Sequence, residues 1–224
     1  RKYGKSKIIP SEYIKNVFLY IFLNSSFIKF LIVGSIGFVI QTLIAKVLIL
    51  GEAPGKDEDE QGVPFIGRSG SLLRQYLNKA GFEKEEYFIT NNILCRPPEN
   101  RVPTQEEITA CSDRLKTLID CMDNLKVIMA VGQTSINNIH GTKNCSWKMG
   151  KSSKMYIKGG NIIGSGTGAT ISSEMVSGLK HIQVIIWGIV HPSYLLRRGK
   201  PEQMMLEWLK ELENVRCTIR ESSR

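Results

Sequence analysis

The chain has 224 residues, of which 42% are hydrophobic, 23% charged and 8% aromatic. This composition excludes a disordered chain, a collagen-like repeat and a disulfide-stapled miniprotein, and the length suits one ordinary domain with an appendage. The formal net charge is +9, but residues 1–46 hold +6 of it, so the charge is weak support for nucleic-acid binding by the main body.

The first 45 residues form an apolar segment with basic flanks. Residues 30–45 contain no charged side chain, and another apolar run lies at residues 17–23. The uncharged run is slightly shorter than the ~20 residues that a spanning helix needs. Two interpretations stay open: a hairpin in contact with a membrane through residues 14–45, and a pair of core helices.

Two stretches of this segment carry a weak family resemblance. They are RKYGKSK at residues 1–7 and FIKFLIVGSIG at residues 27–37. They resemble the junction of the catalytic domain and the GtrA-like membrane domain in polyprenol-phosphate glycosyltransferases. The resemblance includes nothing catalytic and implies a remnant or a fusion artefact. We therefore expect residues 1–45 to be membrane-associated or foreign, and residues 46–224 to form a separate domain.

From residue 46 onward, strand patterns alternate with helix patterns. Strands are predicted at 46–50, 87–90, 126–131 and 184–190, and helices at 69–80, 104–121, 133–139 and 201–215. Such alternation is typical of a three-layer α/β/α sandwich around a central, mainly parallel four-stranded sheet, with its site at the carboxyl ends of the strands. Residues 141–181 are rich in glycine, serine and lysine, which predicts a solvated loop or hairpin, or a basic flap that meets phosphates.

Polar motifs follow the predicted strands. The turn GEAPG at residues 51–55 exposes backbone N–H groups and the carboxylate of Glu52. Phe65 lies on a rigid loop where it could stack on a planar ligand. Asn91 places an amide, which both donates and accepts hydrogen bonds, just past a strand end. The motif HPSYLLRR at residues 191–198 combines a histidine, an apolar tip and two arginines, which suits a developing anion and a nucleic-acid strand.

In this order and spacing, the four segments resemble the type-4 uracil-DNA glycosylases over roughly residues 46–215. The resemblance implies an α/β/α enzyme of base-excision repair that flips uracil out of DNA and hydrolyses its N-glycosidic bond. It implies that Glu52 positions or polarises the attacking water and that His191 stabilises the uracilate oxygen. Phe65 would stack on the flipped base, and Asn91 would read its edge. The other implied contacts are with the substrate (Gly51, Ala53, Gly55) and with DNA (Ser193, Tyr194, Leu195, Leu196, Arg197, Arg198).

The chemistry is consistent with this assignment. Base excision passes through an oxocarbenium-like sugar and an anionic base, so it needs donors aimed at the base and a carboxylate near the sugar. No lysine lies in the motifs as a Schiff-base nucleophile, which favours a monofunctional hydrolase. The expected protein is a cytoplasmic monomer acting on uracil-containing DNA, tethered to a membrane only if the N-terminal segment is genuine. Two alternatives stay open: a membrane-associated glycosyltransferase fragment and an inactive nucleic-acid-binding relative.

The same resemblance implies a 4Fe-4S cluster held by four cysteines. Cys95 and Cys111 match the downstream pair of ligands, 16 positions apart, but residues 1–94 contain no cysteine. Two thiolates cannot complete a cysteine-ligated cluster, and neither Cys121 nor Cys145 has the family's spacing. We therefore expect an incomplete or absent cluster, with two ordinary buried thiols as the alternative.

Overall fold

The computed structural model describes residues 41–140, 152–158, 161–164, 182–199 and 201–221. The apolar N-terminal segment up to residue 40 lies outside these ranges, and so does its predicted membrane contact or helix pair. Of the glycine-rich stretch at 141–181, residues 152–158 and 161–164 are described, and they form the hairpin that was one of the predicted alternatives. Within the described ranges, none of the helices combines the length and the apolar character needed to cross a membrane.

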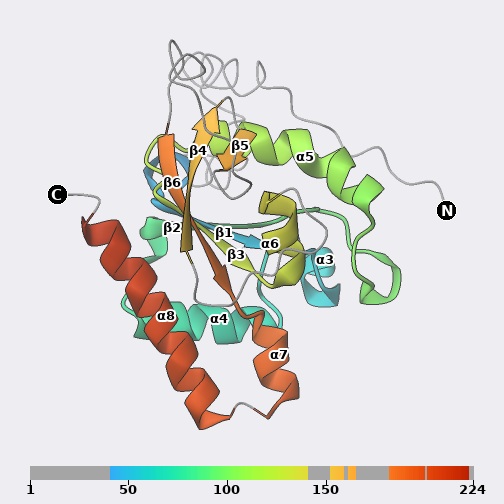
Figure 1. Cartoon of the computed structure of the whole chain (residues 1–224). Helices are drawn as coiled ribbons and strands as arrows, with labels where there is room; N and C mark the ends of the chain where they lie inside the picture. Colours follow the sequence, from blue (N-terminus) through green and yellow to red (C-terminus); the bar gives the residue numbers. More distant parts are fainter. Residues whose placement is uncertain (1–40, 141–151, 159–160, 165–181, 200, 222–224) are drawn as a thin grey trace, which may run out of the picture.

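Six strands form one sheet in the order β2-β1-β3-β6-β4-β5 (Figure 1). The predicted parallel core is confirmed: β1 (Val47–Gly51), β2 (Tyr87–Asn91), β3 (Val127–Val131) and β6 (Ile182–Ile189) run parallel. Beyond β6, β4 (Ser152–Lys158) and β5 (Asn161–Gly164) add an antiparallel hairpin. Every residue of β1, β2 and β3 is buried, as expected for parallel strands covered on both faces.

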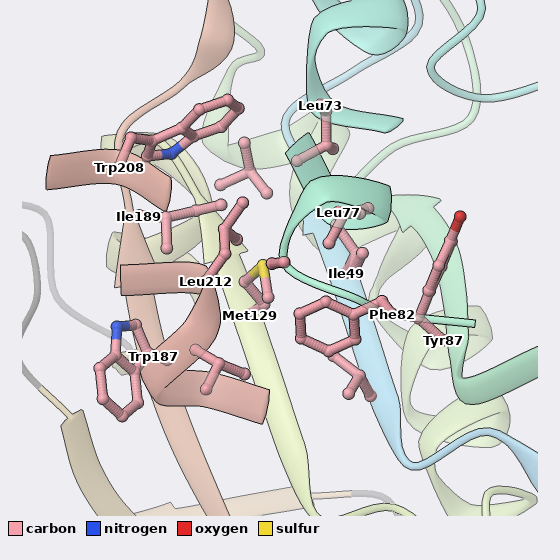
Figure 2. Close-up of a cluster of buried hydrophobic side chains, with 14 of the residues drawn as sticks. Ile49, Leu73, Leu77, Phe82, Tyr87, Met129, Trp187, Ile189, Trp208 and Leu212 are labelled. Carbon is pink, nitrogen blue, oxygen red and sulfur yellow. The ribbon is translucent and has the colours of Figure 1, made fainter. Parts of the chain in front are cut away.

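Helices cover both faces of the sheet and complete the predicted three-layer sandwich. One face packs against α4 (Arg68–Lys79), α7 (Pro192–Arg197) and α8 (Glu202–Glu221), and the other against α5 (Gln105–Asp120) and α6 (Gln133–His140). Figure 2 shows the first layer, where Leu73 and Leu77 of α4 and Leu212 of α8 lie over the sheet. A short helix, α3 (Lys56–Gln61), follows β1.

Some boundaries differ from the sequence prediction. The last helix runs to Glu221, not to Val215, because Ile219 continues the buried face one turn further. The motif at 191–198 is mostly helical: Pro192 occupies the first turn of α7, where a missing N–H costs nothing, and His191 caps it. Thr104 and Glu107 form a capping box at the start of α5.

The packed domain begins before the predicted boundary at residue 46. The side chain of Gln41 donates hydrogen bonds to the carbonyl oxygens of Lys84 (3.1 Å) and Tyr87 (2.9 Å). Ala45 is completely buried in the cluster on the α5 face of the sheet, and Thr42 is also buried. Residues 41–45 therefore pack with the sheet domain, and the division of the chain near residue 46 stays a prediction.

Candidate active site

The carboxyl ends of the parallel strands meet at one edge of the sheet. Gly51, the last residue of β1, lies in register with Asn91, the last residue of β2, and Val131 of β3 lies in register with Ile189 of β6. Because β2 and β3 lie on opposite sides of β1, the strand order reverses there, and this is where doubly wound sheets form their ligand sites.

Gly51 is the point on which two of the predicted site residues converge. A Cβ atom at this position would lie 2.3 Å from Oδ1 of Asn91 and 2.6 Å from two ring atoms of Phe65. Only glycine allows so close an approach of a side-chain amide and an aromatic ring to the backbone. The structure therefore brings Gly51, Phe65 and Asn91 together, although Phe65 lies on a loop and Asn91 at the end of β2.

The backbone around Phe65 is held in an unusual conformation. Its φ angle is 57°, in the left-handed region that non-glycine residues seldom adopt. Arg74 on α4 donates hydrogen bonds to the carbonyl oxygens of Phe65 (3.2 Å) and Pro64 (3.0 Å). A Cβ atom at Gly70 would lie 1.9 Å from the same Phe65 carbonyl oxygen, so α4 approaches this loop through a glycine. These contacts fix the ring, which is 6% exposed.

His191 faces the same ring and is a neutral hydrogen-bond donor. Its ring centroid lies 6.5 Å from that of Phe65, with 37° between the planes. Nδ1 accepts a hydrogen bond from the backbone N–H of Ser193 (3.1 Å), which places the proton of the neutral ring on Nε2. Burial, and secondarily the positive charge of Arg197, lowers the pKa of His191 to about 4. The imidazole is therefore uncharged at neutral pH.

The buried Asn91 is supported from α5 by an arginine that the sequence analysis missed. Arg114 donates hydrogen bonds to the carbonyl oxygen of Asn91 (2.6 Å) and to Oγ1 of Thr90 (3.1 Å). Burial lowers the pKa of Arg114. An arginine among the half-buried positions of a predicted helix carries no signal of this role, because the contact joins residues 23 positions apart.

Glu52 begins the loop after β1, and its carboxylate is held from α6. Oγ1 of Thr134 donates a hydrogen bond of 2.5 Å to Oε2 of Glu52. Thr134, three residues past the third predicted strand, was not singled out from the sequence. Asn92, also missed, is 1% exposed and donates through Nδ2 to the carbonyl oxygen of Gly51 (2.9 Å).

The turn at 51–55 is also joined to the loop that carries Phe65. Oε1 of Glu58 on α3 accepts a hydrogen bond from the backbone N–H of Gly67 (2.9 Å) at the start of α4. The other carboxylate oxygen of Glu58 lies 2.6 Å from the position of a Cβ atom on Gly55. Because Gly55 has no side chain, the Glu58 carboxylate that links the two loops fits beside it. Ala53 lies half-buried in the same turn.

A family model described as the uracil DNA glycosylase superfamily matches residues 40–213. The chain belongs to the uracil DNA glycosylase superfamily. The match includes residues 41–45, which pack against the sheet.

Curated relatives carry the name type-4 uracil-DNA glycosylase. The protein of Sulfurisphaera tokodaii is 33% identical over 78% of this chain and 71% of its own length. That of Thermotoga maritima is 33% identical over 80% of each chain. The protein of Archaeoglobus fulgidus is 43% identical over a shorter stretch, 40% of this chain and 44% of its own length.

One of the residues that the family resemblance assigned to DNA is buried in the core. Leu195 is completely buried in the cluster that α7 shares with α4 and α8. Pro192 and Leu195 lie three positions apart on one face of α7, and this face packs inward. Leu195 therefore has a packing role in this structure, and its contact with DNA stays a prediction.

The other residues of this motif that were predicted to contact DNA are half-buried or exposed. Arg197 and Arg198 are exposed, and the Arg198 guanidinium lies 5.3 Å from the ring centroid of Tyr194. Arg197 donates a hydrogen bond to Oγ of Ser193 (3.1 Å). Leu196 lines a cleft of about 660 Å³ between α7 and the start of α4. In this superfamily member, α7 thus presents two cations and one aromatic ring beside His191.

The cysteines do not fit the four-thiolate cluster that the resemblance implies. Cys95 is exposed and Cys111 is half-buried, while Cys145 lies outside the described residues. The described part of the chain has no group of three or more histidine, cysteine, aspartate or glutamate side chains placed to hold a metal ion. Since residues 1–94 contain no cysteine, the upstream pair of ligands is missing from the sequence itself.

We expect the purified protein to contain far less than four irons per chain and to lack the broad visible absorption of iron–sulfur centres. The physical reason is that Cys95 and Cys111 supply only two thiolates, and such a cluster needs four. Iron analysis and an absorption spectrum after anaerobic purification measure this. Replacing both cysteines with serine is the control and should leave the melting temperature within about 2 °C, a shift that corresponds to less than ~1 kcal/mol. About four irons per chain would contradict the expectation and would point to Cys121 or Cys145 as ligands.

Proposed function

We propose that this protein is a monofunctional uracil-DNA glycosylase that flips uracil out of DNA and hydrolyses its N-glycosidic bond, leaving an abasic site. The observation that carries the proposal is the convergence at Gly51: the Asn91 amide and the Phe65 ring both contact its backbone position, and His191 lies 6.5 Å from that ring. The names of the curated relatives support the same activity.

The first part of the proposal concerns recognition of the base. A flipped pyrimidine has two planar faces and one polar edge, so an enzyme that accepts it needs a stacking partner and a hydrogen-bonding partner. Phe65 supplies an aromatic ring in a fixed orientation, and Asn91 supplies one acceptor and one donor from a rigid strand end. The amide pattern complements the carbonyl and N–H groups of uracil.

The second part concerns the leaving group. When the C1′–N1 bond breaks, its electron pair moves to the base, and negative charge develops on the uracil oxygen. His191 would donate its Nε2 hydrogen to that oxygen. The backbone N–H of Ser193 holds Nδ1, so the donor orientation is fixed before substrate binds.

The third part concerns the water. The sugar becomes positively charged as the base leaves, and the carboxylate of Glu52 would stabilise this charge and orient a water molecule towards C1′. The water oxygen then forms the new bond to C1′, and its proton passes to the carboxylate. No lysine lies in the site motifs to form a Schiff base, which supports hydrolysis without strand cleavage.

The fourth part concerns the DNA. Removing a base from the stack leaves a gap that an inserted side chain can fill. Tyr194 and Leu196 are the half-buried apolar candidates on α7, and the exposed Arg197 and Arg198 would contact the phosphates on either side. These contacts are independent of base sequence, which suits a repair enzyme that searches any DNA.

A gel assay on an oligonucleotide with a single uracil tests the proposal. Incubation with the protein, followed by alkali, should cleave the strand at the uracil, and omission of alkali should leave it intact. Cleavage without alkali would contradict the monofunctional assignment. DNA binding without any abasic product would support the inactive nucleic-acid-binding relative instead.

We expect Asn91→Asp to reduce the preference for uracil over cytosine by about tenfold or more. The change replaces the amide donor with a second acceptor, which suits the exocyclic amine of cytosine, and one such pair discriminates bases by ~1–3 kcal/mol. Rates of excision from uracil-containing and cytosine-containing oligonucleotides measure the ratio. The exposed Asn78 on α4 provides the control, Asn78→Asp. An unchanged ratio in Asn91→Asp would remove Asn91 from the recognition role.

A further inference from the structure

The reversal of strand order between β1 and β3 places α6 next to the site. Glu52 follows β1 directly, and Thr134 lies in the first turn of α6, which follows β3. β1 and β3 are neighbours in the sheet, so the loop after one strand reaches the helix after the other. A hydrogen bond between Glu52 and Thr134 thus spans the crevice in which doubly wound sheets bind their ligands.

The hydrogen bond from Thr134 engages one carboxylate oxygen of Glu52 and leaves the second oxygen for another partner. Oγ1 of Thr134 donates to Oε2 at 2.5 Å, and both side chains are half-buried. In the part of the chain that the structure describes, Oε1 of Glu52 accepts no hydrogen bond and remains available to a water molecule. The carboxylate also lies at the amino-terminal end of α6, where the helix dipole favours a negative charge.

The position of Thr134 is itself fixed by a buried polar network. Ser135, completely buried, accepts a hydrogen bond from Nδ2 of Asn92 (3.0 Å), which also donates to the Gly51 carbonyl oxygen. Nδ2 of Asn138 donates to Oδ1 of Asn92 (2.7 Å). A satisfied network of this kind sets one geometry, because each buried amide group loses its partner if the helix moves.

The same helix start also contacts the segment that carries His191. Gly132 precedes α6 with a φ of 84°, and a Cβ atom there would lie 3.1 Å from Cβ of His191. The start of α6 therefore contacts the loop after β1 through Thr134 and the loop after β6 through Gly132. The two groups that we assign to water and to the leaving base are aligned against one short helix.

From this arrangement we propose that Thr134 is a positioning residue, which acts by orienting the carboxylate of Glu52 with Oε1 free for the attacking water. The inference rests on the proposed glycosylase function and adds a residue to it. Thr134 touches neither base nor sugar in this scheme. Its hydroxyl restricts rotation of the carboxylate, and the network through Ser135 and Asn92 prevents α6 from moving away.

The test compares Thr134→Val, which keeps the shape and removes the hydroxyl, with Thr134→Ser, which keeps the hydroxyl. We expect Thr134→Val to lower the single-turnover rate of uracil release by about 10-fold or more, as misplacing a catalytic group does, with unchanged DNA affinity. Thr134→Ser should recover most of the rate. Thr117→Val on α5, which also removes a hydroxyl from a half-buried helical position, is the matched control and should behave as the wild type.

A double-mutant cycle separates positioning from a general loss of structure. With Glu52→Ala as the background, Thr134→Val should change the residual rate by less than about twofold, because the group it orients is gone. The inference is wrong if Thr134→Val releases uracil at the wild-type rate, or if it loses the same factor in both backgrounds. In either case the wild type still releases uracil and the proposed function stands. A wild type without uracil release would overturn both.

Discussion

Replacing Glu52 with glutamine is expected to lower the single-turnover rate of uracil release by ~10²-fold or more, while the affinity for DNA changes little. A positioned acid–base group contributes about this much to a rate, and glutamine keeps the shape of the side chain but cannot accept a proton from water. The amide can still accept the hydrogen bond that Thr134 donates to Oε2, so the loop after β1 should keep its geometry. The rate is measured with excess enzyme, and the affinity by titration of a labelled uracil-containing duplex.

The control for this prediction is Glu213→Gln. Glu213 is exposed on α8, and its replacement changes the net charge by the same amount without touching the site. Any loss of activity shared by both variants would reflect electrostatic attraction between protein and DNA, which is salt-dependent. An equal loss of binding and of cleavage in Glu52→Gln would mean that Glu52 has a structural role.

The second large effect is expected for His191→Asn, which should reduce the rate by about 10²- to 10³-fold, the usual consequence of removing one donor from a developing anion. Asparagine is a good helix cap and can accept the Ser193 N–H, so α7 should stay folded. It lacks the donor at the position of Nε2. His191→Ala is the comparison and should lose stability as well as rate, because it also removes the cap.

The pH dependence of the wild type and of His191→Asn tests the protonation state of His191. The pKa of His191 is lowered from 6.5 to about 4, so the imidazole is neutral from pH 5 upward, and the factor lost in His191→Asn should be the same at pH 5.5 and pH 8. Between pH 6.5 and pH 4 the unfolded chain binds a proton at this residue that the folded chain excludes. Acidification through that window should therefore destabilise the wild type more than His191→Asn. A wild-type rate that titrates near pH 6.5, with that titration absent from His191→Asn, would contradict a neutral donor.

Most of the fold could be predicted from local patterns. The apolar runs that became β1, β2, β3 and β6 are short and bounded, and their burial on both faces requires helices between them. The antiparallel hairpin of β4 and β5 lies in a polar, glycine-rich stretch whose composition fits a loop equally well. The stretch forms strands because β4 pairs with β6, a long-range contact that the local sequence does not indicate.

Site residues could be predicted where a chemically suitable side chain lies at the end of a predicted strand. Glu52, Asn91 and His191 are polar residues at or just past the ends of strands, and parallel strands bring their carboxyl ends to one edge of the sheet. Phe65 stood out as an aromatic residue on a rigid loop, and the family resemblance implied its stacking on the flipped base. Its left-handed backbone conformation could not be predicted from the neighbouring residues.

The sequence alone thus determined the layer architecture, the edge that carries the site and the absence of cysteines upstream of residue 95. Only the tertiary structure decided which side of a segment faces the core and which distant residues support the site. Leu195 reads as part of an exposed loop until the helix α7 turns it inward, and Thr134 reads as an ordinary helical residue until the order of the strands places it against Glu52. The physical reason is that periodicity and turn chemistry act over a few residues, whereas these contacts join segments up to 82 positions apart and exist only after the sheet has formed.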